Sequence, residues 1–212
     1  MRPVGIVTGL AAEARIARRL GVPVEVGGGC AEGAAAASQR LVEGGVGSLI
    51  SFGLAGGLHP ALVPGTVLVP TAVLLDGERW DTDGALVRRL GGATPGALYG
   101  GGEVVASVAA KAAAFARTGA VAVDLESAAV ARTARRHGLP FAVLRAVCDG
   151  AGRNLPRAAL AALDGAGRIG GLRVAWAAAS RPWELPGLIR LGGDAARARL
   201  ALVTRVREIG RL

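Results

Sequence analysis

Short apolar runs alternate with helix-like periodicity along the first 150 residues of the chain. Apolar runs that end in glycine or polar residues are typical of buried strands, and apolar residues at three- and four-residue spacing are typical of helices. The predicted strands are residues 3–8, 22–26, 46–52 and 141–147, with a strand pair within 65–75. The predicted helices are residues 11–20, 31–43, 108–117 and 127–137. This alternation predicts an α/β fold in which helices cover a sheet.

The pattern changes beyond Asp149, where helical periodicity dominates. The predicted helices there are residues 155–179, 188–192 and 195–209. A chain of 212 residues is long enough for one well-buried domain and too short for two of ordinary size. We therefore expect a single domain, with an α/β core over residues 1–154 and a helical C-terminal part of the same domain over residues 155–212.

Small side chains must build the core. Hydrophobic residues make up 51% of the chain but aromatic residues only 3%, and 34 residues are glycine. This composition favours helices packed closely on a parallel sheet over an aromatic-rich β-sandwich. Residues 44–75 hold no acidic or basic side chain except His59, but glycines and prolines divide them into strand-length pieces. That division favours a buried sheet over a membrane span.

The formal net charge of +9 comes almost entirely from arginine, because Lys111 is the only lysine. We expect Lys111 to be solvated on its helix. A basic chain can bind nucleic acid, but no basic run here is interleaved with stacking aromatic residues, which argues against a nucleic-acid partner. An anionic membrane surface or an acidic small molecule fits the charge as well.

The two cysteines, Cys30 and Cys148, lie far apart and belong to no CxxC or histidine-containing motif. Neither a disulfide framework nor a metal site is indicated. The first apolar run is short and is followed by charged residues from Glu13 onward, which is not a signal-peptide pattern. We expect a reducing, cytoplasmic setting.

Two carboxylates stand at corresponding places, each where an apolar run ends. Glu126 closes the segment 124–126, and Asp149 follows the strand 141–147. Ligands bind at the carboxyl ends of strands in open α/β sheets, and an acid there can bind sugar hydroxyls or donate a proton. Simpler roles remain open, because Glu126 can complement a helix dipole and Asp149 can form a turn with the next glycine.

Two further features lie at strand-to-helix turns. Glu13 falls in the first turn of its predicted helix, where it can complement the helix dipole or orient a water molecule in the crevice. Gly27, Gly28 and Gly29 follow the strand 22–26 and let a ligand approach backbone N–H groups.

The segments around both carboxylates resemble the nucleoside phosphorylase and nucleosidase superfamily, most closely its methylthioadenosine/adenosylhomocysteine nucleosidase branch. There an acidic-Met-Glu helix start precedes a Pro-Phe-x-x-x-Arg-x-x-x-Asp strand, and residues 124–126 and 140–149 match these motifs. The resemblance implies a mixed, mostly parallel twisted sheet flanked by helices. It implies that Glu126 binds the ribose hydroxyls and that Asp149 protonates N7 of a departing purine. Leu125 replaces the methionine that contacts the sugar.

The resemblance extends to two further substrate-binding segments. Residues 53–58 match a Gly-Ser-x-Gly-Gly-Leu motif, which implies that Leu54 and Gly56 contact the substrate. Relatives carry a base-stacking phenylalanine where this chain has Val105, so base stacking here must be aliphatic or come from elsewhere.

The nucleophile stays open between water and phosphate. A glutamate at the place of Glu13 activates water in the nucleosidase branch, and the glycines 27–29 and Ser51 mark the phosphate-or-water site. Phosphorolytic members hold phosphate with an arginine and a serine where this chain has Ser51 and Leu54. A carboxylate at Glu13 would also repel phosphate, so the residues favour hydrolysis.

Further segments of the chain carry a closer resemblance, namely TGLAAEARIA, SFGLAGGL, LPFAVLRAVCD and the arginine-rich C-terminal part. Together they look most like the hopanoid-associated phosphorylase family. That resemblance implies release of adenine from adenosylhopane in hopanoid side-chain synthesis. The family name implies phosphorolysis, with inorganic phosphate as co-substrate and no other cofactor or metal. The alternatives are a methylthioadenosine/adenosylhomocysteine or futalosine nucleosidase, and a non-enzymatic nucleoside-binding module.

The same resemblance carries expectations about partners and location. Relatives form homo-oligomers, and the substrate would be a small-molecule or lipid-linked nucleoside. The C-terminal helices either cover the sheet or contact the inner face of the membrane. In the second case the apolar residues at the bilayer are Trp176, Trp183, Leu185 and Leu188.

Overall fold

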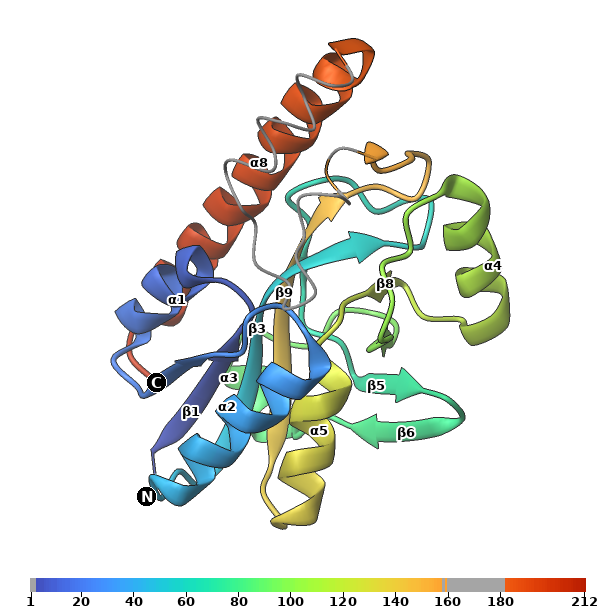
Figure 1. Ribbon diagram of the computed structural model, residues 1–212. Helices are drawn as coiled ribbons and strands as arrows, with labels where there is room; N and C mark the ends of the chain where they lie inside the picture. Colours follow the sequence, from blue (N-terminus) through green and yellow to red (C-terminus); the bar gives the residue numbers. More distant parts are fainter. Residues whose placement is uncertain (1–2, 158, 160–181) are drawn as a thin grey trace.

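A single curled sheet of nine strands forms the centre of the computed structural model, which describes residues 3–157, 159 and 182–212 (Figure 1). Four parallel strands form its main part, in the order β2, β1, β3, β9. They are β2 (Val24–Val26), β1 (Val4–Thr8), β3 (Ser48–Gly57) and β9 (Phe141–Asp149). Their carboxyl ends therefore meet at one edge of the sheet, where the candidate carboxylates lie.

The long strand β3 joins the two parts of the sheet. Its last residues, Gly56 and Gly57, pair with the antiparallel strand β8, and the order continues through β7 and β5 to β6. The strands of this second part are β8 (Ala122–Val123), β7 (Leu98–Tyr99), β5 (Ala72–Leu75) and β6 (Glu78–Asp81), and β4 (Val67–Leu68) pairs with β9. The sheet is thus mixed and mostly parallel in its centre, which confirms the predicted fold class.

Helices cover both faces of the sheet. The helices α2 (Ala31–Glu43) and α5 (Ser127–Arg136) pack on one face through small residues such as Ala34, Ala37 and Ala131. The other face carries α1 (Ala11–Ala17), the 3₁₀ turn η1 (Arg18–Leu20), α3 (Gly84–Arg89) and α8 (Leu185–Ile209). The helix α4 (Val108–Thr118) packs over a separate small core beside β8. The alanine- and valine-rich composition is what lets these layers pack closely.

Several predicted boundaries differ from the structure, and two of the differences join segments that were predicted to be separate. The glycine-rich segment 53–58 continues the strand predicted for residues 46–52, because β3 runs to Gly57 and shifts its register against β9 at Gly56. Residues 188–192 and 195–209 belong to one helix, α8, because the glycine pair between them does not interrupt it. Most of the helix predicted for residues 155–179, together with Trp176, lies outside the described residues.

The projecting half of α8 extends beyond the sheet (Figure 1). Trp183, in the turn η2 (Pro182–Glu184) before it, and Ile189 are 73% and 74% exposed. Leu188, by contrast, faces the cavity described below. Within the described part of the chain, no helix is both long enough and apolar enough to cross a bilayer.

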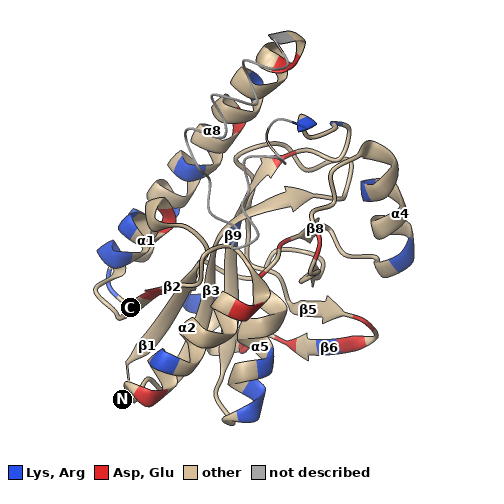
Figure 2. Ribbon diagram, in the orientation of Figure 1, with Lys and Arg blue, Asp and Glu red and all other residues tan. Residues whose placement is uncertain are grey.

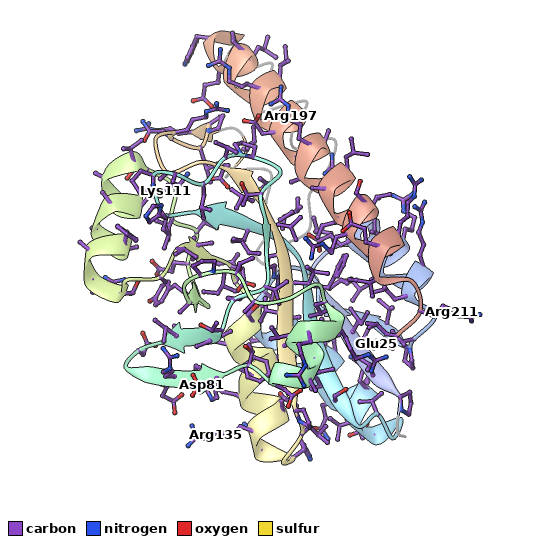
Figure 3. All side chains as sticks on the ribbon, turned by 180° about the vertical axis from the view of Figure 1, so that it is seen from behind. Glu25, Asp81, Lys111, Arg135, Arg197 and Arg211 are labelled. Carbon is purple, nitrogen blue, oxygen red and sulfur yellow. The ribbon has the colours of Figure 1, made fainter. Side chains whose placement is uncertain are left out.

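The prediction for Lys111 is wrong. Its side chain has no exposed surface, and Figure 3 shows it between α4 and the rest of the molecule, whereas the labelled Arg135 and Arg211 extend outward. The arginines are spread over α1, α5 and α8 and do not gather on one face (Figure 2). The positive charge therefore forms no single basic surface in the described residues.

Candidate functional site

A cavity of about 470 Å³ lies at the carboxyl ends of the central strands, and one side of it is closed by α8. Residues from the turn after β1, from the ends of β3 and β9 and from the segment 123–126 form its floor. Four predicted acidic or apolar positions line it together, namely Glu13, Leu125, Glu126 and Asp149. The predicted Gly29, Leu54, Gly56 and Val105 line it as well.

Arg145 on β9 lies at the centre of the polar wall and is 1% exposed. Its Nη2 donates to Glu126 Oε2 at 2.8 Å and to Ser51 Oγ at 2.7 Å. Its Nε lies 2.7 Å from Asp124 Oδ2 as an ion pair, although the N–H is not aligned for a hydrogen bond. Burial alone would lower the Arg145 pKa, but the Asp124, Glu126 and Glu13 carboxylates outweigh it and raise that pKa. The guanidinium therefore stays charged.

Asp124 organises the start of α5. Its Oδ1 accepts hydrogen bonds from the backbone N–H groups of Glu126 at 3.2 Å and Ser127 at 3.0 Å, while the Ser127 hydroxyl donates to Oδ2. An aspartate that satisfies free N–H groups stabilises a helix N-terminus. In the motif Asp124-Leu125-Glu126, the first residue thus fixes the helix start and the third presents its carboxylate to the cavity.

Glu126 is 6% exposed, and burial raises its pKa to about 7. The Arg145 charge opposes this shift, while the Glu13 and Asp124 carboxylates reinforce it. At neutral pH the Glu126 carboxyl group therefore exists in both forms, so it can accept or donate hydrogen bonds. Such a group suits a pair of sugar hydroxyls, each of which is both donor and acceptor.

Glu13 lies near Arg145, in the first turn of α1, and is 3% exposed. Its Oε2 accepts the backbone N–H of Leu10 at 2.8 Å, and its Oε1 accepts that of Leu54 at 3.0 Å. Burial raises the Glu13 pKa, and the Arg145 charge partly offsets that rise. A buried carboxylate with a raised pKa that lines a cavity has the properties of a general base.

Asp149 ends β9 and is 5% exposed. Lys111 Nζ donates a hydrogen bond to its Oδ2, and the Cys148 thiol donates to its Oδ1 at 3.3 Å. Burial and then the Asp149 charge raise the Cys148 pKa, which keeps that thiol protonated. A Cβ at Gly56 would lie 3.3 Å from Oδ1, so glycine leaves this oxygen free of a crowding side chain.

Three predicted positions, Ser51, Gly27 and Gly28, do not reach the cavity wall. Ser51 is fully buried behind Arg145, where its hydroxyl also lies 2.9 Å from the Ser127 hydroxyl. The carbonyl of Gly27 packs directly against Gly33 of α2, and of the glycine triplet only Gly29 lines the cavity. Sequence reasoning assigned no role to Arg145 or Lys111, because each contacts residues far away in the sequence.

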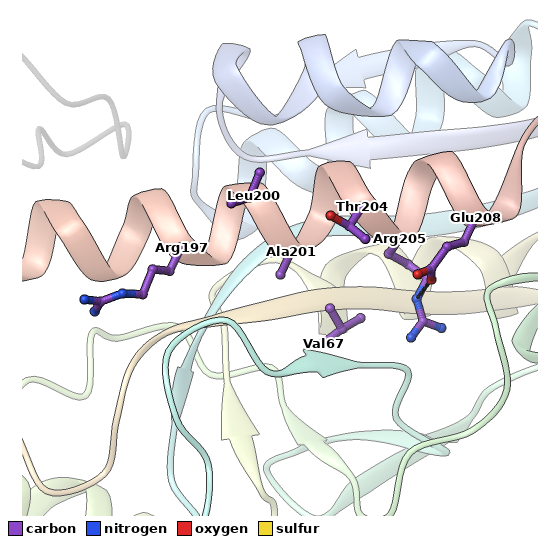
Figure 4. Close-up of a pocket in the computed structure, with 7 residues that line it drawn as sticks. All are labelled: Val67, Arg197, Leu200, Ala201, Thr204, Arg205 and Glu208. Atoms are coloured by element: carbon purple, nitrogen blue, oxygen red, sulfur yellow. Dashed lines mark ion pairs between the residues drawn. The ribbon is translucent and has the colours of Figure 1, made fainter.

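A second, shallower pocket of about 360 Å³ lies between α8 and β4 (Figure 4). Arg205 at one end donates to the carbonyl of Leu90 and pairs with Glu208 at 3.2 Å. These contacts attach α8 to the loop after α3, and no pair of buried carboxylates is present. Within the described residues, no group of three or more His, Cys, Asp or Glu side chains is placed to hold a metal ion.

Comparisons with known proteins identify the family and the fold. The sequence model of the phosphorylase superfamily matches residues 21–94 and 92–166, which together exceed half of the chain. No curated protein matches the chain.

Solved structures share the fold at low sequence identity. One is the 5′-methylthioadenosine/S-adenosylhomocysteine nucleosidase from Neisseria meningitidis in complex with methylthio-immucillin-A, with 20% identity, a TM-score of 0.72, and coverage of 99% of this chain and 98% of that one. Another is the futalosine hydrolase of Helicobacter pylori, with 16% identity, a TM-score of 0.67 and coverage of 98% of each chain. A third, from Colwellia psychrerythraea, is a nucleosidase in complex with adenine, at 17% identity and a TM-score of 0.68, covering 100% of this chain and 98% of that one.

Proposed function

Because the chain belongs to the phosphorylase superfamily, we propose that it cleaves the N-glycosidic bond of a purine nucleoside. One observation carries this proposal: three buried carboxyl groups, those of Glu13, Glu126 and Asp149, surround a single cavity of nucleoside size. A glycosidic bond breaks through an oxocarbenium-like transition state, which needs a proton for the leaving group and a nucleophile for the anomeric carbon.

The three groups divide this work. Glu126 binds the ribose hydroxyls, held in place by Arg145. Asp149 donates a proton to the purine as the bond lengthens, so the base leaves as a neutral molecule. Glu13 takes a proton from the attacking water, which then adds to the anomeric carbon. A positioned acid and a positioned base each contribute roughly 10²–10⁴-fold to such a reaction.

The contacts of Glu13 favour water over phosphate. Two backbone N–H groups, one at the start of α1 and one in β3, point to one place, which is an arrangement that binds anions. The Glu13 carboxylate already fills that place through Leu10 and Leu54. The nearest buried guanidinium, Arg145, is occupied by Asp124, Glu126 and Ser51. Phosphate would therefore find its donors taken and a carboxylate beside it.

The apolar side of the cavity supports a large apolar group on the 5′ side of the substrate. Leu155, Leu188 and Leu191 line it together with Leu10, and α8 contributes this surface along one side. We infer from this surface and the resemblance to the hopanoid-associated phosphorylase family that the substrate is adenosylhopane and the product adenine. Burial of the polycyclic group in such a cavity is favourable because it removes apolar surface from water.

The projecting end of α8 suggests how such a substrate reaches the cavity. Trp183, Leu185 and Ile189 are exposed there, and Arg190 is exposed beside them. Apolar side chains with arginines beside them are typical of helices that lie at a membrane surface. We therefore propose that the protein acts in the cytoplasm at the inner face of the membrane, as a homo-oligomer. Vesicle co-sedimentation and analytical ultracentrifugation test these two points.

Arg199 favours a second candidate substrate class. It lines the cavity from α8, and the described part of the chain gives it no acidic partner. A guanidinium on a binding surface recognises carboxylates. Adenosylhomocysteine and futalosine both carry a carboxylate on the 5′ side, so a nucleosidase for either compound would use Arg199.

The first experiment incubates the purified protein with adenosylhopane, with and without phosphate, and measures adenine and the sugar product. Equal adenine release in both conditions, with free ribosyl product, supports hydrolysis. Release that requires phosphate, with a ribose-1-phosphate product, contradicts the role of Glu13. If no adenine is released in either condition, the next substrates to test are methylthioadenosine, adenosylhomocysteine and futalosine. Saturable binding without cleavage of any of them would identify a binding module. Asp149→Ala, which should abolish turnover but not folding, is the control for the site.

A further inference from the structure

The buried side chain of Lys111 has a contact for each of its three N–H donors. Nζ donates to Asp149 Oδ2, to the carbonyl of Gly150 at 2.9 Å and to the carbonyl of Arg153 at 3.0 Å. An ammonium group has three donors and no acceptor, so this set of three acceptors is complete for the charged form. A buried ammonium without oxygen acceptors beside it is strongly unfavourable, and the carboxyl group of Asp149 supplies one of these oxygens.

The ion pair also orients the carboxyl group of Asp149. Lys111 holds Oδ2, whereas Oδ1 accepts the Cys148 thiol and is the oxygen nearer to a Cβ placed at Gly56, at 3.3 Å against 3.6 Å for Oδ2. Both Cys148 and Gly56 line the cavity. One oxygen is therefore bound to the interior of the protein, and the other is presented to the substrate. Rotation of the carboxyl group would break the bond to Nζ.

We propose that Lys111 is a positioning residue for the acid of the reaction and stabilises the charge that forms on it. This inference rests on the proposed function, in which Asp149 protonates the leaving base. As the C–N bond breaks, its electron pair goes to the purine, and the proton moves from Asp149 to a purine nitrogen. A carboxylate remains beside the Lys111 ammonium, which keeps all of its protons. A fixed charge aimed at the place where charge develops lowers the barrier.

A purely architectural role is the competing explanation. Lys111 also holds the loop after β9, and this loop is attached to α4 a second time, because Asn154 Oδ1 accepts the Val108 N–H at 2.7 Å. If Lys111 only supports this loop, its loss should lower stability and slow every substrate by the same factor. If it assists proton donation, its loss should slow only substrates that need a proton.

The experiment compares two substrates with Lys111→Met, whose side chain has a similar length and no charge. One is the purine nucleoside, and the other is p-nitrophenyl β-D-ribofuranoside, whose leaving group departs without protonation. We expect kcat for the nucleoside to fall on the order of 10- to 100-fold, part of the usual contribution of a general acid. The rate with the nitrophenyl riboside should change by less than about threefold. An equal fall for both substrates would overturn the inference.

A pH profile gives an independent readout. Removal of a positive charge beside a buried carboxylate favours its protonated form, so the alkaline limb of kcat/KM for the nucleoside should move to higher pH in Lys111→Met. The other titratable or charged groups that face Asp149 or share its cavity wall are Cys148 and Arg145 on β9, Glu103 before α4, Glu13 on α1, Asp124 and Glu126 before α5, and Arg199 on α8. They are unchanged in the variant. An unmoved limb contradicts the inference.

Three further variants separate the outcomes. Ser107→Ala removes the hydroxyl that accepts the Ala110 N–H at 3.1 Å, which weakens α4 without touching Asp149, so its two rates should change equally. Lys111→Gln keeps donors toward the loop but has no charge, and it replaces Lys111→Met if the latter does not fold. Asp149→Ala tests the proposed function itself. If it still cleaves the nucleoside, that function fails, whereas an inactive Asp149→Ala with a fully active Lys111→Met refutes only the role of Lys111.

Discussion

Replacement of Glu126 by glutamine should change how protein stability depends on pH. Glutamine has nearly the same shape and retains an oxygen toward Arg145, but it does not titrate. The pKa of Glu126 is raised from its ordinary 4.5 to about 7 in the folded protein. A raised pKa means that the folded state binds this proton more tightly than the unfolded state does. The contribution to stability is therefore full below pH 4.5 and is lost as the pH rises through 7.

The magnitude follows from the two pKa values. By the linkage relation, the wild-type protein loses about 2.5 kcal/mol of its free energy of unfolding between pH 5 and pH 8. Glu126→Gln should not show this loss. The assay is urea unfolding of both proteins at pH 5, 6, 7 and 8, with free energies from linear extrapolation. The difference between the two proteins should move in favour of the variant by about that amount as the pH rises.

The matched control is Glu103→Gln, because Glu103 lines the same cavity but is exposed. Solvent screens an exposed carboxylate, so this variant should follow the wild-type curve at every pH. If the free energies of unfolding of Glu126→Gln and the wild type change in parallel from pH 5 to pH 8, the inference that burial raises the pKa of Glu126 is refuted.

Three further changes test other parts of the site. Glu13→Gln places an NH₂ group against one of the two backbone N–H donors, so urea unfolding should show a loss of about 1–3 kcal/mol of stability. Product release should show a fall in kcat of at least roughly 10²-fold. A fully active variant would remove Glu13 from the mechanism. Arg145→Met leaves Asp124 and Glu126 without their cation and should destabilise the protein by about 3–5 kcal/mol. This loss should appear as a large fall in the urea concentration at the midpoint of unfolding. An unchanged midpoint would show that the two carboxylates need no counter-charge. Gly56→Ala brings a methyl group to 3.3 Å from Asp149 Oδ1. The variant should therefore have a lower kcat, while its urea unfolding curve stays close to that of the wild type. An unchanged kcat would mean that Oδ1 does not face the substrate.

The apolar runs predicted the central strands for a simple physical reason, because buried parallel strands appear as continuous apolar runs. Asp149, which ends β9, lies at the edge where the carboxyl ends of the parallel strands meet. Glu126 reaches the same cavity by another route, because β8 before it pairs antiparallel with the last two residues of β3. The extension of β3 was missed because glycine-rich segments carry no strand pattern, although β3 continues through them to Gly57.

Contacts between distant residues were not predictable from spacing. Lys111 and Asp149 are separated by 38 positions, and a single lysine in an alanine-rich helix gives no sign of which way it faces. Ser51 was expected at the nucleophile site but bonds to Arg145 behind it, because the side chains of a strand alternate between its two faces. Such assignments need the register of the sheet as well as the order of its strands.

A tilt of the helix α8 would move its cavity-lining residues more than its buried residues. Its C-terminal half is fixed to the sheet by the buried Ala198, Leu202 and Val206, and its other half carries Leu188 and Leu191 on the cavity. Leu188 lies about 15 Å along the helix axis from Ala198, the nearest of these buried residues, at the usual rise per residue. A tilt of about 15° around Ala198 would therefore move Leu188 by roughly 4 Å, which is close to the thickness of an aliphatic side chain. A wide apolar substrate could enter by such a tilt while the core stays packed.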